Sequence, residues 1–300
     1  MAALQTDPQL RVCLEQLKAL TNHNHVALTN CGNSAIFLAL NIVKNIHPKP
    51  YLLIPDQGGW LSYETYPLLL GFQIKKVKTD RCLIDLDDLK TKLENHDAAA
   101  LLVASNAGYC ALQDMQAIAN ICKSADCLLI DDASGSLGMR FLLGNNDASS
   151  VCDGNLADII VGSFGRWKIV DVGHGGFISC KEDWLKEDHA PYPPLSFTKH
   201  RIDLNILHQK LENIKKRLQF LMTSADRVKS ELQQSGFSVV HPHKKGLNVI
   251  AAFHDEHEKN KILDWCKKQT PQSFETTLCP RYIRVMEPAV SIELKRLQEK

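Results

Sequence analysis

The sequence has almost no excess charge and no long apolar run, and each absence excludes a class of protein. Among its 300 residues, 35 Lys and Arg balance 34 Asp and Glu, so the net charge is +1. Proteins that bind nucleic acid or anionic membranes through their charge carry a basic excess, so we expect neither partner. No apolar run approaches the roughly 20 residues that a membrane-spanning helix needs.

The ten cysteines include no Cys-X-X-Cys pair, which argues against a structural zinc site, and we expect no metal. They are too dispersed for the disulfide framework of a small secreted domain. Several, such as Cys127 and Cys180, lie in apolar runs, where a free thiol behaves as a small buried apolar group. The N-terminal MAALQTDPQL does not resemble a signal peptide. We therefore expect a cytoplasmic protein with reduced thiols.

Short apolar runs alternate with helical patterns through the first 180 residues. Seven runs are predicted to be strands: Val26–Asn30, Tyr51–Pro55, Phe72–Val77, Ala99–Ala104, Cys127–Asp131, Ala157–Gly162 and Gly176–Cys180. Most are apolar throughout, which is typical of strands buried on both faces of a mostly parallel sheet. Helices are predicted at Ser34–Val43, Leu61–Leu70, Asp85–Leu93 and Leu112–Ser124. The alternation predicts a three-layer α/β fold around a mostly parallel seven-stranded sheet.

The pattern changes near residue 190, where three prolines interrupt the chain. A long amphipathic stretch over Ile202–Leu232 predicts a helix that bridges two domains. Strands follow at Ser238–Val240, Leu247–Phe253, near Thr276 and at Tyr282–Val285, with helices at Lys259–Lys268 and from Ile292 onward. We predict a large α/β domain over residues 1–195 and a smaller α+β domain over residues 196–300.

Lys168 is the residue around which a candidate active site can be built. It follows a predicted strand, with Ser163 five residues before it and a glycine cluster at residues 173–176 after it. Between apolar strands a lysine has a lowered pKa, so that its amine can act as a nucleophile. Such a lysine can form a Schiff base with an aldehyde cofactor. The alternative is a solvated lysine in a surface loop.

Asp131 ends a predicted buried strand, where α/β sheets bind their ligands. An anion beside the pyridine nitrogen of pyridoxal phosphate keeps that nitrogen protonated, which lets the ring withdraw electrons from a substrate carbanion. Equally, Asp131 or Asp132 could cap the turn that follows.

Two further segments suggest cofactor contacts. Gly32-Asn33-Ser34 lies between a predicted strand and helix, where free backbone N–H groups can bind a phosphate, although Asn and Ser there also make an ordinary helix cap. Trp60 follows a Gly-Gly turn and could stack on a heteroaromatic ring or pack in a core or interface.

The order Gly32–Ser34, Trp60, Asp131, Lys168 resembles that of fold-type I PLP-dependent enzymes, the aspartate aminotransferase superfamily, and most of all its DegT-like branch. The similarity covers roughly residues 25–180. It implies phosphate contacts from Gly32, Asn33, Ser34 and Ser163, ring contacts from Trp60, Asp131 and Ser134, and a Schiff base at Lys168. Gly173, Gly175 and Gly176 would permit close backbone approach. Ser134 replaces the His or Gln of the sugar aminotransferases, and His174 replaces a Glu.

The resemblance implies pyridoxal 5′-phosphate (PLP) as cofactor. It implies an aminotransferase acting on an amino acid or amino sugar and a keto acceptor, with Lys168 holding the cofactor as an internal aldimine and Asp131 maintaining the electron sink. It also implies a homodimer with the site at the interface. Two alternatives stay open: a PLP-dependent lyase or cysteine desulfurase, and a non-catalytic regulator or scaffold.

The segment Cys279–Val285 holds candidate substrate contacts. By resemblance to amino-acid aminotransferases, Arg284 or Arg281 would bind the substrate α-carboxylate as a bidentate pair; surface arginines on an edge strand are the alternative. Cys279 is the candidate thiol for a desulfurase. Arg166 could contact the phosphate or a partner subunit.

Overall fold

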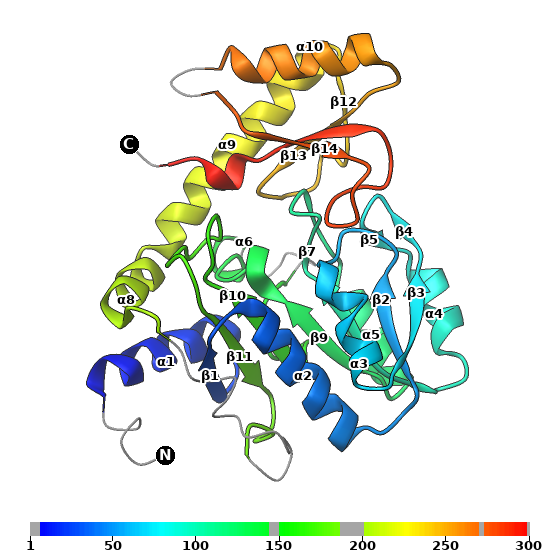
Figure 1. Ribbon diagram of the computed structural model, residues 1–300, viewed down its shortest axis with the longest axis vertical. Helices are drawn as coiled ribbons and strands as arrows, with labels where there is room; N and C mark the ends of the chain where they lie inside the picture. The colour runs from blue at the N-terminus through cyan, green and yellow to red at the C-terminus, as the bar shows by residue number, and fades with distance from the viewer. Residues whose placement is uncertain (1–6, 144–149, 187–200, 270–272, 299–300) are drawn as a thin grey trace.

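The computed structural model describes residues 7–143, 150–186, 201–269 and 273–298 (Figure 1). A large α/β part and a smaller part are linked by the long helix α9 (Ile214–Gln234). The predicted domain boundary between residues 195 and 196 lies outside the described residues.

Seven strands form the central sheet, in the order β1-β11-β10-β9-β6-β2-β3. They are β1 His25–Thr29, β2 Tyr51–Pro55, β3 Gln73–Val77, β6 Ala98–Ala104, β9 Leu128–Asp132, β10 Ile159–Ser163 and β11 Gly176–Cys180. Strand β11 is antiparallel to β1 and β10, and the other neighbouring pairs are parallel. The predicted mostly parallel seven-stranded sheet is confirmed, with all seven strands at the predicted segments.

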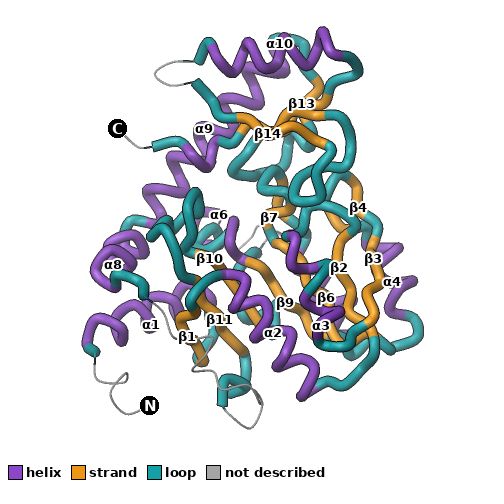
Figure 2. Tube along the Cα trace, in the orientation of Figure 1, coloured by secondary structure: helices purple, strands orange, loops and turns teal. Residues whose placement is uncertain are grey.

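Helices cover both faces of this sheet and give the three predicted layers (Figure 2). Helix α2 (Gly32–Ile46) packs on one face, and α1 (Pro8–Thr21), α4 (Leu86–Leu93) and α5 (Met115–Ser124) pack on the other. Successive residues of β6 belong to different cores: Leu101 lies in the core under α1, α4 and α5, and Leu102 in the core under α2. Because strand side chains alternate between faces, a strand covered twice must be apolar throughout.

Shorter elements connect these layers. The predicted helix Leu61–Leu70 is a 3₁₀ turn, η1 (Leu61–Tyr63), followed by the short helix α3 (Tyr66–Leu69). Two small hairpins, β4–β5 (Thr79–Asp80 with Leu83–Ile84) and β7–β8 (Asn106–Ala107 with Ala111–Leu112), lie beside the sheet. A 3₁₀ turn η2 (Ala133–Gly135) and the short helix α6 (Arg140–Leu143) follow β9.

The C-terminal part is α+β, as predicted. Strands β12 (Ser238–Val239), β13 (Val249–Ala252), β15 (Ala289–Ile292) and β14 (Thr276–Cys279) form an antiparallel sheet in that order, and α10 (Glu256–Lys267) packs beside β15. The predicted strand Tyr282–Val285 is wrong: a turn occupies this segment, with the Arg281 N–H donating to the Val285 carbonyl (2.9 Å).

Two predicted helices also differ from the helices in the structure. The bridging stretch is two helices, α8 (Leu204–Glu212) and α9, which meet at Asn213. The predicted terminal helix from Ile292 is a single 3₁₀ turn, η3 (Leu294–Arg296), within the residues that the structure describes.

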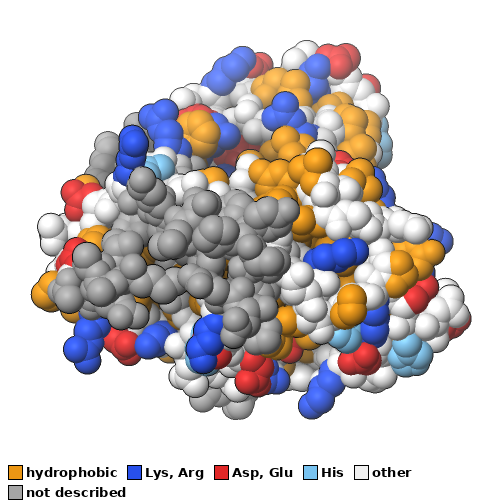
Figure 3. Space-filling view, turned by 60° about the horizontal axis from the view of Figure 1, so that its bottom comes forward, with side chains coloured by type: hydrophobic (Ala, Val, Ile, Leu, Met, Phe, Trp, Pro, Cys, Tyr) orange, Lys and Arg blue, Asp and Glu red, His pale blue; other side chains and the backbone are white. Residues whose placement is uncertain are grey.

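The described surface agrees with the near-zero net charge. On the face shown in Figure 3, basic and acidic side chains are interspersed along the edge of the molecule. None of the helices in the described ranges has both the length and the apolar composition to cross a bilayer.

His23 ties the segment after α1 to the sheet. Its buried ring has Nδ1 3.0 Å from Ser179 Oγ and Nε2 3.0 Å from the Ala157 carbonyl oxygen. Burial disfavours the charged imidazolium and lowers the pKa of His23 to about 4.

Acid should therefore destabilise the fold through His23. An unfolded histidine has a pKa of about 6.5. Between that pH and about pH 4, the unfolded state therefore binds a proton that the folded state does not. The stabilisation is fully present above about pH 6.5 and is lost as the pH falls toward the folded pKa. We expect the loss of unfolding free energy between about pH 7 and about pH 5, measured with urea, to be about 1–2 kcal/mol smaller in His23→Gln than in the wild type. Equal losses would contradict this role of His23.

Candidate active site

A cavity of about 200 Å³ opens at the carboxyl edge of the central sheet, lined by segments that follow β1, β2, β6, β9 and β10. This is the edge at which open α/β sheets bind ligands. Six of the predicted site residues line it: Gly32, Asn33, Trp60, Ser134, Ser163 and Lys168. Four others, Ser34, Asp131, Arg281 and Arg284, are not part of its wall.

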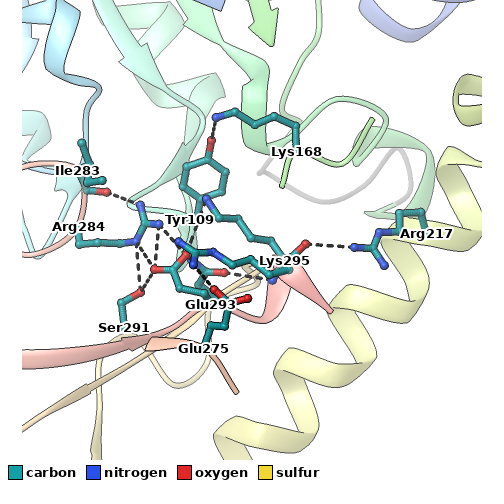
Figure 4. A network of polar contacts seen from close by, with 11 residues as sticks. Tyr109, Lys168, Arg217, Glu275, Ile283, Arg284, Ser291, Glu293 and Lys295 are labelled. Atoms are coloured by element: carbon teal, nitrogen blue, oxygen red, sulfur yellow. Dashed lines mark hydrogen bonds and ion pairs between the residues drawn. The ribbon is translucent and has the colours of Figure 1, made fainter. Parts of the chain in front are cut away.

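Lys168 lies in the loop between β10 and β11, half-buried, with its amine close to two aromatic rings. Its Nζ is 5.3 Å from the centre of the Trp60 ring and 5.1 Å from that of the Tyr109 ring. It also donates a hydrogen bond to the Tyr109 hydroxyl (Figure 4). The structure thus joins Lys168 and Trp60, as predicted, and adds Tyr109, which sequence reasoning missed although it follows the buried strand β6.

The lysine loop is held by Asp171, which was not predicted. One carboxylate oxygen accepts the backbone N–H of Trp167 (2.7 Å) and the other that of Gly173 (2.9 Å). Trp167 has φ of 64°, a left-handed conformation that a bulky side chain rarely adopts. The segment before Lys168 is therefore held in a strained, defined conformation, as is common at functional sites.

The predicted phosphate contacts gather at the first turn of α2. No side chain caps this turn, so the helix N-terminus can receive an anion. A Cβ at Gly32 would lie 2.7 Å from Ser163 Cβ, so only glycine allows this close approach. Asn33 accepts a hydrogen bond from the Trp60 indole (2.8 Å). Ser34 lies outside the wall, its Oγ 3.3 Å from the Cys31 thiol, which does line the cavity.

Of the glycines after Lys168, Gly176 permits the predicted close backbone approach, whereas a Cβ at Gly173 would meet nothing within 4 Å. Gly173 and Gly175 have positive φ values of 84° and 96°. A Cβ at Gly176 would lie 2.6 Å from the Gly162 carbonyl oxygen and 2.8 Å from the Gly32 nitrogen. The last glycine therefore lets β10, β11 and the start of α2 meet.

Asp131 does not face the cavity, which corrects the prediction for this residue. It is fully buried, and its two oxygens accept backbone N–H groups of Ser105 (3.3 Å) and Cys152 (3.0 Å). Burial raises the pKa of Asp131 to about 7. Asp132 faces the cavity instead, because successive side chains of a strand point to opposite faces.

The Asp132 carboxylate is held in place from two sides. Its Oδ2 accepts the Tyr63 hydroxyl (2.8 Å), and its Oδ1 accepts the backbone N–H of Ser134 (3.0 Å). Burial and the neighbouring Asp132 charge raise the pKa of Tyr63 well above its usual value, so its phenol remains a donor. Tyr63 was missed in the sequence, where nothing links it to Asp132.

One buried polar atom on the cavity wall lacks a partner. The Asn106 amide donates to the Gly135 carbonyl (2.8 Å), but its Oδ1 is buried without any hydrogen bond. Leaving such an atom unpaired costs about 1–3 kcal/mol, which a bound group with a donor would offset. With the anion site at α2, the Trp60 ring and the Lys168 amine, these residues fit a flat, phosphorylated aldehyde such as PLP.

Arg284 is committed to a buried ion pair, so the structure contradicts its predicted contact with substrate. Only 3% of Arg284 is exposed, and its Nε and Nη2 donate to Glu293 at 2.8–3.1 Å. Burial opposes ionisation of Glu293, but Arg284 and Lys295 outweigh it and lower its pKa to about 2. Arg281 is exposed, away from the cavity wall.

The remaining candidate residues lie apart from the cavity. Burial raises the pKa of the Cys279 thiol at the end of β14, so this residue does not resemble a reactive thiol on a mobile loop. His174 is exposed, 2.8 Å from the Arg201 carbonyl, and Arg166 packs over the exposed Trp167. In the described parts of the chain, no group of three or more His, Cys, Asp or Glu could hold a metal ion.

Lys295 is a buried cation next to the site. Its Nζ lies 3.7 Å from the centre of the Tyr109 ring and 3.8 Å from Glu293 Oε2 (Figure 4). Burial and the nearby Arg284 charge lower the pKa of Lys295 well below its usual value. The burial of Lys295 beside Tyr109 was not predictable from the sequence, because Lys295 stands in a basic terminal segment.

Two protein families match different parts of the chain. Residues 4–200 match the DegT/DnrJ/EryC1/StrS aminotransferase family, and residues 212–300 match the MJ1341 family C-terminal domain. A probable L-tyrosine/L-aspartate decarboxylase of Methanosphaerula palustris is 28% identical over 138 residues. That segment covers 44% of this chain and 38% of the decarboxylase.

Solved structures with the same architecture cover nearly the whole chain. Serine palmitoyltransferase of Sphingomonas wittichii aligns with a TM-score of 0.70 at 14% identity, over 96% of this chain and 71% of the enzyme. The synthase of 3-amino-5-hydroxybenzoic acid aligns with a TM-score of 0.70 at 14% identity, over 96% and 86%. NtdA of Bacillus subtilis, with bound PMP, aligns with a TM-score of 0.68 at 17% identity, over 96% of this chain and 73% of NtdA. These similarities confirm the predicted PLP-transferase fold.

Removing Glu293 should destabilise the fold, because Arg284 would remain buried without its partner. We expect Glu293→Ala to lower the free energy of unfolding by about 3–5 kcal/mol, measured by urea unfolding. Arg281→Ala, at an exposed position, should change it by less than about 0.5 kcal/mol. A Glu293→Ala variant as stable as the wild type would return Arg284 to the candidate substrate contacts.

Proposed function

The chain belongs to the DegT/DnrJ/EryC1/StrS aminotransferase family, and we propose that it is an aminotransferase that moves an amino group from an amino acid or amino sugar to a keto acceptor. PLP is the cofactor, and when bound it supplies an electron sink for a carbanion. The observation that carries the proposal is the position of Lys168, whose amine lies close to the Trp60 ring and the Tyr109 hydroxyl and which lines the same cavity as the uncapped N-terminus of α2.

Lys168 has two roles in this proposal. Its amine holds the cofactor, and once displaced by the substrate amine it moves the proton at the substrate Cα. The Tyr109 hydroxyl accepts a hydrogen bond from Nζ, so Tyr109 orients the amine. The rings of Trp60 and Tyr109 restrict where Nζ can go.

The other cavity residues bind and orient. Asp132 takes the role predicted for Asp131, that of the anion beside the pyridine nitrogen, because it faces the cavity and its oxygens are fixed by Tyr63 and Ser134. Gly32, Asn33 and Ser163 would hold the phosphate at the first turn of α2. The indole hydrogen bond to Asn33 fixes the plane of the Trp60 ring, against which an aromatic ring can stack.

We also propose that the protein is a cytoplasmic homodimer. Three leucines just after Trp60, Leu61, Leu68 and Leu69, are 58–72% exposed. Neighbouring exposed apolar side chains favour an interface, and a partner seated there would close the cavity beside Trp60. The ten cysteines are all free, as expected in a reducing compartment.

A PLP-dependent decarboxylase is the second candidate, on the 28% identity to the Methanosphaerula palustris protein over 138 residues. Products separate the two: a transaminase gives a keto acid from the donor, and a decarboxylase releases CO₂. The desulfurase alternative loses its candidate thiol because Cys279 is buried. A scaffold has no need of a lysine hydrogen-bonded to Tyr109 in a cavity.

Lys168→Ala should abolish the near-visible absorbance of lysine-bound PLP. The protein is incubated with PLP, freed of excess cofactor by gel filtration, and its spectrum recorded. Lys216→Ala is the matched control, since Lys216 is exposed on α9 and outside the cavity wall. An unchanged spectrum in a folded Lys168→Ala protein would exclude Lys168 as the cofactor-binding amine.

Asp131 and Asp132 should respond differently to replacement by Asn. Asp132→Asn should weaken PLP binding about 10-fold or more, the effect of losing one charge-assisted contact. Asp131→Asn should leave PLP affinity largely unchanged but lower the free energy of unfolding by about 1–3 kcal/mol, because an amide has one acceptor oxygen for two backbone N–H groups. Fluorescence titration with PLP and urea unfolding measure the two effects. The reverse pattern would restore Asp131 as the cofactor-facing carboxylate.

A further inference from the structure

Lys295 is a buried ammonium group that rests on an aromatic ring of the candidate site. It lies on η3 in the C-terminal part, and 8% of the residue is exposed. Its Nζ is 3.7 Å from the centre of the Tyr109 ring and 3.8 Å from Glu293 Oε2. The distance to Glu293 is longer than a hydrogen bond. The ring is therefore a direct partner of the cation, because its π electrons attract an ammonium group at this distance.

The Tyr109 ring joins cations from both parts of the chain. Lys168, from the large part, donates a hydrogen bond to the Tyr109 hydroxyl, and its Nζ lies 5.1 Å from the ring centre. From the C-terminal part, Lys295 Nζ and the Arg284 guanidinium lie 3.7 and 5.1 Å from the same centre (Figure 4). Any shift of the ring therefore changes the contacts of Lys168 and Lys295 together.

Asn248 fixes the backbone of Lys295 relative to that of Tyr109. Its backbone N–H donates to the Tyr109 carbonyl (2.8 Å), and its side-chain Oδ1 accepts the backbone N–H of Lys295 (3.3 Å). Its Nδ2 donates to Glu293 Oε2 (2.9 Å). Asn248 is fully buried, and breaking hydrogen bonds that are shielded from water is costly. One buried residue thus holds Lys295 and Tyr109 at a defined separation.

The Tyr109 ring also has a close neighbour in the large part of the chain. A Cβ at Gly135 would lie 2.8 Å from Tyr109 Cε1 and 2.9 Å from Cδ1, so the edge of the ring packs directly against the backbone at Gly135. This glycine belongs to η2 and lines the candidate-site cavity. Contacts from η2 and from Lys295 on η3 together fix the direction in which the Tyr109 hydroxyl points.

We propose that Lys295 is a positioning residue of the candidate active site, which holds the Tyr109 ring and thereby fixes the place of the Lys168 amine. The C-terminal part then sets how fast Lys168 captures an aldehyde. The inference rests on the proposed function, because it takes the Lys168 amine as the reacting group. Lys295 acts through Tyr109 and is not part of the wall of the candidate-site cavity. A misplacement of about 1 Å can lower a reaction rate about 100-fold, so the loss of this support is measurable as slower capture.

The rate at which the protein captures PLP tests this role. Excess PLP is mixed with cofactor-free protein, and the growth of the near-visible absorbance is followed by stopped flow. We expect Lys295→Met to lower the second-order rate constant about 10-fold or more, because Met has no charge that holds the ring. Lys295→Arg should stay within about 3-fold of the wild type, since a guanidinium also stacks on an aromatic face. Lys261→Met, at an exposed position on α10 in the same part of the chain, is the matched control and should leave the rate unchanged.

A double-mutant cycle with Tyr109→Phe separates positioning from a general structural defect. Tyr109→Phe keeps the ring but removes the hydroxyl that binds Lys168. If Lys295 acts through that hydroxyl, adding Lys295→Met to Tyr109→Phe should slow capture by less than about 2-fold further. A structural defect would instead slow capture by the same factor with and without the hydroxyl.

The neutral variants are expected to fold. In Lys295→Met, Glu293 keeps Arg284 as its partner, so no carboxylate is left buried without a counter-charge. Lys295→Gln, which is neutral but can donate to Glu293, is measured beside it, so that the test does not depend on the folding of one variant.

Two results would overturn the inference and leave the proposed function standing. One is a wild-type capture rate in a folded neutral variant of Lys295, and the other is an equal loss of rate with Tyr109 and with Tyr109→Phe. Absence of the near-visible absorbance from the wild type would overturn the proposed function, and the inference with it.

Discussion

The position of Tyr109 is the constraint on which the candidate site depends. Its hydroxyl accepts the hydrogen bond from Lys168, and its ring carries Lys295. Its backbone carbonyl accepts the N–H groups of Leu247 and Asn248, both at 2.8 Å, from the C-terminal part of the chain. Tyr109 is thus hydrogen-bonded to both parts of the molecule. Its φ of 65° is a strained value for an aromatic residue, which the surrounding contacts maintain.

The fold was predictable because strands buried on both faces of a sheet have sequences that are apolar almost throughout. Six of the seven strands of the central sheet lie at mostly apolar runs, whereas β3 is an edge strand that contains Gln73, Lys75 and Lys76. The family and its fold are confirmed. The wrong predictions concern segments outside the central sheet, where this pattern is absent. The predicted strand Tyr282–Val285 has strand-like composition but closes a turn on Arg281, and the strand of this region, β15, lies later, at Ala289–Ile292. The turn at Asn213 divides an amphipathic pattern that continues through α8 and α9 without a break.

The site was predicted in its order along the chain but not in its side-chain directions. Asp131 and Asp132 are adjacent residues at one strand end. Because successive side chains of a strand point to opposite faces, one of them faces the cavity and the other faces the core. Composition cannot tell which of the two faces the core. The structure can, because the backbone N–H groups of Ser105 and Cys152 donate to Asp131. Tyr63 is likewise linked to Asp132 only by the fold.

The same reasoning applies to the cations near the C-terminus. Arg284 has the residue type of a substrate contact, but Glu293 neutralises it in a bidentate pair. That pairing uses the carboxylate that Lys295 would otherwise have, and so leaves a second cation beside Tyr109 with a weak counter-charge. A buried charge without a full partner is costly, and burial together with the Arg284 charge accordingly lowers the pKa of Lys295 well below its usual value.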